Sequence, residues 1–337
     1  MILTTPLIRA IRTVFPNASV TSVVIPQCAE IVSGWSDKVF TIDKKRGGEE
    51  VWANAISKIA KAGIGVAFVP HRSFRSGKLL NEAGIPVRIG FDHGGGKLFH
   101  SLTVPYPIHE YEGGRNLKLL KPFNNGPFDP LPELRIDRPA VEKVYQIKRQ
   151  LKVQDSAYAV IAPASVWKTK AWPTESYRIL SEYLLTRFGL ETVAVGGPDD
   201  KAICGSAVQR PELNLSGELS PIESAELMRT SRFVISGDSA AAHLATSVRV
   251  RQVIIFGSTA PRFGFAPDSN NVRLLGLDMG CRPCTDHGRN SCPIYKTIRC
   301  MENISPSMVI ASLSDWLVLN EETAINSVDN DNQSRYL

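Results

Sequence analysis

The feature that most constrains the fold is an alternation between short apolar runs and longer segments of helical period. The apolar runs are rich in Val and Ile and span residues 20–25, 64–69, 157–161, 191–195, 233–235 and 252–256. Helical spacing predicts helices between them, at residues 49–61, 139–151, 173–187, 220–228 and 239–248. Continuously apolar strands separated by helices are typical of parallel sheets that are covered on both faces. We therefore predict an α/β fold.

The chain holds two such sets of strands and helices in series, which predicts two doubly wound, Rossmann-like domains facing a cleft. A length of 337 residues also suits two cores better than one. The join is predicted in residues 122–139, which are rich in Pro, Gly and Asn. We place the domains at residues 1–138 and 139–320. Residues 321–337 have few large apolar side chains and are predicted to be a disordered tail.

The start of the chain departs from the usual doubly wound order, in which a strand comes before the first helix. Thr4 and Thr5 can cap a helix, Pro6 suits its first turn, and Leu7 and Ile8 begin its apolar face. A strand before this helix is absent from the sequence. We therefore expect the first strand of the N-terminal domain to be missing, and the alternative is a fold that simply begins with a helix.

Charge is divided unevenly along the chain. Residues 1–153 carry 22 basic and 13 acidic residues, whereas residues 154–337 carry 17 and 20. The basic half predicts an anionic partner: nucleic acid, a phosphorylated molecule or a membrane surface. Nucleic acid is disfavoured, because no basic stripe follows a helix and no aromatic platform repeats.

The distribution of apolar residues also bears on location. No uncharged apolar run approaches the roughly 18 residues that a membrane-spanning helix needs. The N-terminus lacks the order of segments found in a signal peptide. Six cysteines spread over the chain fit a reducing compartment. We therefore expect a protein in the cytoplasm or on the inner face of a membrane.

Residues 236–243, with the sequence SGDSAAAH, are the strongest candidate for a ligand site. They follow an apolar strand and open a helix that Asp238 or Ser239 would cap. The free amides and the dipole of a helix N-terminus attract phosphate, and small residues such as Ala240 let it come close. His243 lies one turn into the helix and could donate a further hydrogen bond. The alternative is an ordinary cap with a core histidine.

Two other loops follow strands of the same domain. Residues 162–173 include Ser165 and Lys170, and a lysine there can place a positive charge on a diphosphate. Residues 196–200 (GGPDD) allow a tight turn, and Asp200 stands where an acidic side chain often accepts hydrogen bonds from ribose. A solvated loop and a simple turn are the alternatives. Together with residues 236–243, these loops predict a nucleoside diphosphate site.

A basic stretch follows the strand at residues 64–69 in the first half. It places Arg72, Arg75 and Lys78 beyond the end of that strand, toward the cleft between domains. Such a group of cations suits a phosphorylated or carboxylated acceptor. The alternative is a solvated basic face.

Four cysteines crowd together near the C-terminus. Cys281, Cys284, Cys292 and Cys300 have the spacing C-x2-C-x7-C-x7-C. This pattern suits a structural zinc that holds a loop, although the spacing is not that of a common zinc ribbon. Reduced buried thiols and a labile disulfide are the alternatives. Four thiolates would leave no open position for catalysis.

The sequence resembles the lipopolysaccharide heptosyltransferases of glycosyltransferase family 9, most of all the heptosyltransferase II type, from Met1 to about Leu319. The order and spacing of several short motifs carry the resemblance. They are TTPLIRA from Thr4, RSFRS from Arg72, AGIP from Ala83, RIG from Arg88, KAWP from Lys170, GGP from Gly196, Asp238 and Ser239 with HLA from His243, and the cysteine-rich stretch followed by ISP from Ile304.

The resemblance implies a GT-B fold, an ADP-heptose donor on the C-terminal domain and an anionic lipopolysaccharide core acceptor on the basic N-terminal domain. It implies inverting transfer that requires no metal. The implied donor-site residues are Ser165, Lys170, Asp200, Asp238, Ser239, Ala240 and His243. Other GT-B enzymes that use nucleotide sugars and an inactive ADP-binding homologue are the alternatives.

One family element has no counterpart in the sequence. The base of the family is an Asp in a Gly-Asp turn that precedes the TTPLIR helix, and this chain starts at that helix. We therefore assign no catalytic base to it. A start assigned too late, or a truncated chain, is the preferred explanation, and a variant without the base is the other. We expect little transfer activity from the chain as written.

Overall fold

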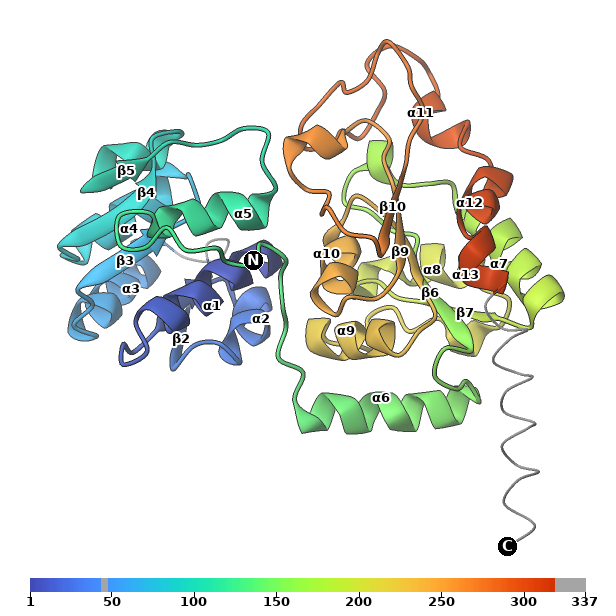
Figure 1. Ribbon diagram of the computed structural model, residues 1–337, viewed down its shortest axis with the longest axis horizontal. Coiled ribbons are helices and arrows are strands. Elements are labelled where there is room, and N and C mark those ends of the chain that lie inside the picture. The colour runs from blue at the N-terminus through green and yellow to red at the C-terminus, as the bar shows by residue number, and fades with distance from the viewer. Residues whose placement is uncertain (44–47, 319–337) are drawn as a thin grey trace, which may run out of the picture.

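The computed structural model describes residues 1–43 and 48–318. The predicted tail at 321–337 lies outside the described residues. Figure 1 shows two α/β units joined by a long segment that leads into α6 (Arg138–Leu151). Within the described ranges, none of the helices has the length and apolar composition needed to cross a bilayer.

The second unit is built on one parallel sheet. Its strands lie in the order β10-β9-β8-β6-β7, and every pairing in it is parallel. Their bounds are β6 (Tyr158–Ala162), β7 (Glu191–Ala194), β8 (Val234–Gly237), β9 (Gln252–Ile255) and β10 (Val272–Leu275). All residues of β6, β8 and β9 are buried. The prediction of buried parallel strands is confirmed here.

Helices cover both faces of this sheet. In Figure 1, α9 and α10 lie on one side of the strands, and α7 and α12 lie on the other. The helices of this unit after α6 are α7 (Thr174–Phe188), α8 (Lys201–Ala207), α9 (Pro221–Arg229), α10 (Ala240–Ser247), α11 (Arg299–Glu302), α12 (Pro306–Ser312) and α13 (Ser314–Val318). The sheet is thus doubly wound, and the loops at the carboxyl ends of its strands share one edge.

The first unit contains two separate parallel sheets among its described residues, of order β1-β2 and β3-β4-β5. The strands are β1 (Thr21–Val24), β2 (Lys38–Thr41), β3 (Val66–Val69), β4 (Val87–Phe91) and β5 (Leu102–Val104). The helices are α1 (Thr5–Val14), α2 (Ala29–Ser33), α3 (Glu49–Lys61), α4 (Phe74–Glu82) and α5 (Glu112–Leu117). The first described strand follows α1, as the sequence predicts.

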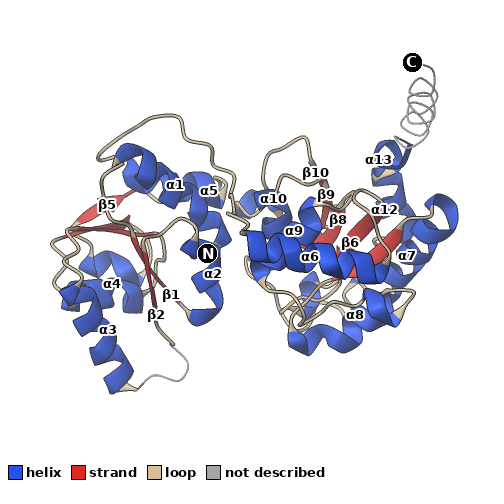
Figure 2. Ribbon diagram, turned by 90° about the horizontal axis from the view of Figure 1, so that it is seen from below, coloured by secondary structure: helices blue, strands red, loops and turns tan. Residues whose placement is uncertain are grey.

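Burial in the first unit is lower than the sequence predicts. In β3, Val66 remains 40% exposed and only Val69 is fully buried. The expectation of continuously buried strands is therefore wrong for this unit. Figure 2 shows α3 and α4 on one side of these strands and α1 and α5 on the other.

The two units contact each other beside the start of the chain. The short turn Ile2–Thr4 packs against α10, and α2 packs against α9. The Glu112 amide donates to the Gly264 carbonyl at 2.7 Å, and the Arg115 guanidinium donates to the Phe263 carbonyl at 2.7 Å. These contacts hold α5 of the first unit against the loop after β9. The boundary at 138/139 stays a prediction.

Candidate active site

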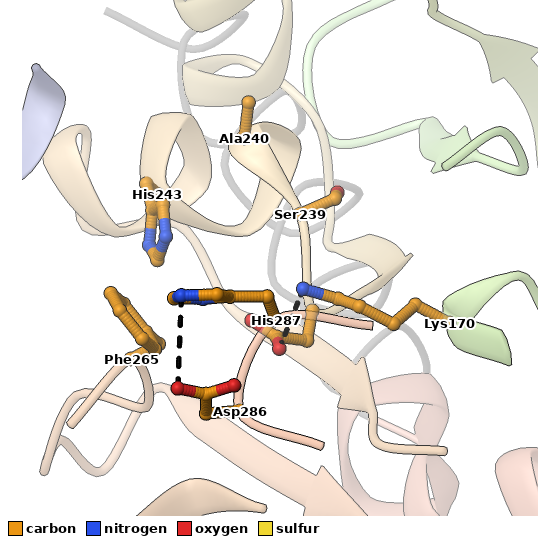
Figure 3. Close-up of a pocket in the computed structure, with 8 residues that line it drawn as sticks. Lys170, Ser239, Ala240, His243, Phe265, Asp286 and His287 are labelled. Atoms are coloured by element: carbon orange, nitrogen blue, oxygen red, sulfur yellow. Dashed lines mark ion pairs between the residues drawn. The ribbon is translucent and has the colours of Figure 1, made fainter. Parts of the chain in front are cut away.

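A pocket of about 210 Å³ opens where β6 and β8 end, at the edge where open α/β sheets bind ligands. Figure 3 shows the side chains around it, which come from loops after several strands. The pocket is lined by Lys170, Asp238, Ser239, Ala240, His243, Phe265, Asp286 and His287. Five of these eight residues are predicted donor-site residues, so the structure brings the 162–173 loop and the 236–243 motif together.

Lys170 and Asp238 form a buried ion pair in the pocket. The Lys170 Nζ lies 2.8 Å from the Asp238 Oδ2, and the two side chains are 14% and 6% exposed. The same carboxylate oxygen accepts a hydrogen bond from the Thr259 hydroxyl at 2.8 Å. An ammonium group has three donors, so one bond to Asp238 leaves others for an anion in the pocket. Asp238 therefore fixes the position of the lysine rather than consuming its binding capacity.

The N-terminus of α10 forms a second wall of the pocket. Ser239 is its N-cap, in extended conformation with φ of −146°, and makes no side-chain capping hydrogen bond. The first backbone amides of α10 thus keep their donors for another partner. Ala240 is exposed and presents only a methyl group there. Lysine and helix tip together offer positive potential from two directions.

His243 is a neutral group beside these charges. Burial lowers the pKa of its imidazole to about 4, with a smaller contribution in the same direction from Lys170 and the Met1 amino group and an opposing one from Asp238. Its Nδ1 is enclosed and has no hydrogen-bond partner among the described residues. The ring therefore stays uncharged at neutral pH, and it can donate or accept one hydrogen bond from a ligand.

The lowered pKa of His243 predicts a pH dependence of stability. Between pH 7 and pH 5.5 the unfolded imidazole takes up a proton while the folded one stays neutral, so stability falls as the pH is lowered. The loss expected from this group is about 1 kcal/mol of unfolding free energy. Urea unfolding at both pH values should show a smaller loss in His243→Asn than in the wild type. Equal losses in the two proteins would contradict this account of His243.

Two predicted donor residues do not line the pocket. Ser165 is half-buried in the loop after β6, where its hydroxyl accepts the Trp167 amide at 3.4 Å. Asp200 closes its own turn, because its Oδ2 accepts the Gly197 amide at 2.7 Å. Both lie on loops at the same edge of the sheet as the pocket. Their roles toward a ligand stay predictions.

The predicted acceptor residues belong to different elements. All three follow the end of β3, as the sequence predicts, but Arg75 and Lys78 lie on α4, a helix that was not predicted. Ser73 caps that helix by accepting the Ser76 amide at 3.2 Å. Arg72 stays in the loop, with its guanidinium 4.3 Å from the centre of the Tyr106 ring. None of the three basic residues lines the pocket described above.

The four C-terminal cysteines line a second, small pocket. Burial raises the pKa of the Cys300 thiol, and the nearby Arg282 guanidinium opposes this shift. Across the described residues, no three His, Cys, Asp or Glu side chains are arranged to hold a metal ion. A structural zinc at Cys281, Cys284, Cys292 and Cys300 therefore stays a prediction from the cysteine spacing alone.

Three pocket residues are not predicted from the sequence. Phe265 follows β9, with its ring centre 6.3 Å from that of His243. Asp286 and His287 come from the loop at residues 281–300, which we call the cysteine-rich loop. The sequence does show two adjacent polar residues between the cysteines, but the cysteine spacing led us to predict a metal site there rather than a ligand contact.

Comparison with known proteins decides the family. A profile of Glycosyltransferase family 9 (heptosyltransferase) matches residues 57–294, well over half of the chain. The chain belongs to glycosyltransferase family 9. The resemblance noted in the sequence is thereby confirmed at the level of the family.

Curated members of glycosyltransferase family 9 match parts of the chain. Lipopolysaccharide heptosyltransferase 1 of Pseudomonas aeruginosa is 29% identical over 161 residues, which cover 44% of this chain and 43% of that protein. Lipopolysaccharide heptosyltransferase 3 of Escherichia coli is 31% identical over 121 residues, covering 34% of this chain and 35% of that protein. The chain thus spans less than half the length of the curated relatives it matches.

A solved structure gives a fuller match to the fold. The E. coli ADP-heptose lipopolysaccharide heptosyltransferase II superposes with a TM-score of 0.76 over 95% of this chain and 96% of that chain, at 18% identity. At this identity the likeness shows the fold alone. The predicted α/β fold of the GT-B class is confirmed for this member of family 9.

Proposed function

We propose that this family 9 protein is an inverting glycosyltransferase that moves heptose from ADP-heptose to the inner core of lipopolysaccharide, as the heptosyltransferase II type does. The observation that carries the proposal is the convergence of the Lys170 ammonium group and the uncapped start of α10 on one pocket. A diphosphate is the group that such a pair binds well. The names of the curated relatives support the sugar and the acceptor.

The same groups suit the chemistry of transfer. When the bond between sugar and phosphate breaks, negative charge grows on the departing ADP. Lys170 is already held by Asp238 at 2.8 Å, and the amides of α10 are fixed by the helix, so neither must reorganise as the charge develops. We propose that these groups stabilise the leaving group and that catalysis requires no metal ion.

The size of the pocket limits what it holds. A volume of about 210 Å³ is below the roughly 300–1,000 Å³ of pockets that enclose a whole small ligand. We propose that the pocket takes the diphosphate and the sugar. The nucleoside then lies outside it, along the edge of the sheet toward Asp200 and the turn after β7.

The basic first unit is proposed to bind the anionic acceptor. Residues 1–138 carry 18 basic and 12 acidic residues, and Arg72, Arg75 and Lys78 are the proposed contacts. A lipid-linked acceptor would bring the protein to the inner face of the inner membrane as a cytoplasmic, peripheral protein. Charge is the support for this part of the proposal.

Nucleotide selectivity tests the proposal. ADP at a hundredfold excess over its Kd should add about 2.7 kcal/mol of stability, whereas UDP at the same concentration should add much less. Thermal unfolding with each nucleotide measures the difference. A larger shift with UDP would favour another nucleotide-sugar enzyme, and no shift with either would overturn the proposal. Mass spectrometry of a truncated lipopolysaccharide core incubated with ADP-heptose then tests transfer itself.

A further inference from the structure

Two polar side chains line the pocket together with the groups proposed to bind phosphate. Figure 3 shows Asp286 on the far side of the pocket from Ser239 and Ala240, with the His287 ring between His243 and Asp286. The His287 Nε2 lies 3.7 Å from the Asp286 Oδ2. Their side chains are 69% and 68% exposed, so both keep most of their hydrogen-bonding capacity for a ligand. Phe265 adds an aromatic face to the same part of the pocket.

The cysteine-rich loop is attached directly to the loop that carries Lys170. The Arg289 amide donates to the Thr169 Oγ1 at 2.8 Å, and the Thr169 amide donates to the Arg289 carbonyl at 3.0 Å. Thr169 is buried and adjoins Lys170 in sequence. A further bond joins the Cys284 amide to the Ser258 carbonyl at 3.1 Å. Asp286 and His287 are therefore held in place relative to the lysine that faces the diphosphate.

Strand order tells which part of a nucleotide sugar these residues meet. Lys170 follows β6 and Ser239 follows β8, which are the neighbouring central strands. The turn with Asp200 follows β7 on one side, whereas the cysteine-rich loop follows β10 on the other. In a nucleotide sugar the diphosphate lies between the nucleoside and the sugar. With the nucleoside on the β7 side, the sugar must lie on the side of β9 and β10.

We propose that Asp286 and His287 are specificity-determining residues that bind the hydroxyl groups of the donor sugar, with Phe265 packing against its apolar face. The inference rests on the proposed function and goes beyond it by assigning the sugar subsite to the cysteine-rich loop. A carboxylate accepts from neighbouring hydroxyls, and an imidazole both donates and accepts. The ligand class is a polyhydroxylated sugar joined to a nucleoside diphosphate.

The opposite orientation of the ligand makes a different prediction. It would place the adenine ring between Phe265 and His287 and the sugar beside Asp200. Loss of His287 would then weaken the binding of ADP itself. Comparing ADP with ADP-heptose therefore separates the two orientations.

Calorimetry with ADP and with ADP-heptose tests the inference. The wild type should bind ADP-heptose at least tenfold more tightly than ADP. In the variant with both Asp286→Ala and His287→Ala, the affinity for ADP should stay within twofold, and the advantage of ADP-heptose should fall about tenfold. The single variants Asp286→Asn and His287→Gln keep the approximate size of each side chain. Each should lose part of the affinity advantage of ADP-heptose over ADP. Asp268→Asn, exposed and outside the pocket, is the matched control and should change neither affinity.

Each contrary result has a distinct meaning. If the wild type binds neither ligand, the proposed function fails and the inference fails with it. If the wild type binds ADP but gains nothing from the sugar, only the inference fails. An equal loss of ADP and ADP-heptose binding in the double variant, with unchanged thermal unfolding, overturns the sugar subsite in favour of the opposite orientation.

Discussion

Lys170→Met is expected to lower the affinity for ADP by more than a hundredfold. A charge-assisted hydrogen bond contributes roughly 1.5–3 kcal/mol, and its loss alone weakens binding by about 10- to 100-fold. The substitution also leaves the Asp238 carboxylate, 6% exposed, without its cation at the proposed diphosphate site. Removing one partner of a buried pair should further lower the unfolding free energy, by roughly 3 kcal/mol. Calorimetry and urea unfolding measure the two effects.

Two further variants separate binding from folding. Lys168→Met changes an exposed lysine of the same loop and should leave both quantities nearly unchanged. Adding Asp238→Asn to Lys170→Met removes the unpaired charge, so stability should recover in part while ADP binding stays weak. An ADP affinity that survives in the Lys170→Met protein would show that this lysine does not hold the diphosphate.

Gly237→Ala is expected to disrupt the pocket through its backbone. Gly237 ends the central strand β8, and a Cβ built there lies 2.6 Å from the Lys170 carbonyl oxygen. That neighbour is a backbone atom, so the loop or the strand must move. We expect a loss of about 1–3 kcal/mol in unfolding free energy, typical of overpacking, and a fall of more than tenfold in ADP affinity.

A glycine in open surroundings provides the control for this substitution. A Cβ at Gly65 meets nothing within 4 Å, so Gly65→Ala should alter neither stability nor ADP binding by much. The measurements are again urea unfolding and calorimetry. Normal ADP affinity in Gly237→Ala would mean that the close approach of β8 and the Lys170 loop does not matter for the site.

The sheet of the second unit could be predicted well, because strands that are buried on both faces appear in the sequence as continuous apolar runs. Strands β6, β8 and β9 are short apolar runs, and the structure places each within two residues of its predicted bounds. Strands β4 and β10 were not predicted, because each contains an arginine whose side chain binds a partner outside the sheet. Arg88 donates to the Phe99 carbonyl at 2.6 Å, and Arg273 pairs with Asp315 at 2.5 Å. Such partners are distant in sequence and break the apolar pattern.

The candidate site shows the same division between local and distant information. The helix start at Ser239 and the lysine loop could be read from single stretches of sequence. The ion pair between Lys170 and Asp238 forms because β6 and β8 are neighbours in the sheet. Asp286 and His287 line the pocket because hydrogen bonds between Thr169 and Arg289 hold their loop there. Helix α4 was missed although Ser73 is a local cap signal, because the cations of this stretch were interpreted only as a basic group after the strand.

Two hydrogen bonds between Thr169 and Arg289 connect the lysine loop to the cysteine-rich loop, so on the proposed function the diphosphate and the sugar should not bind independently. A ligand that orders the Lys170 loop also orders the cysteine-rich loop, because the two loops are hydrogen-bonded. The entropy lost on ordering them is then lost only once when both parts of a ligand bind. The affinities of isolated fragments, a diphosphate and a free sugar, would then fail to sum to the affinity of the intact donor. On this proposal, one buried threonine couples the binding of the two halves of the donor.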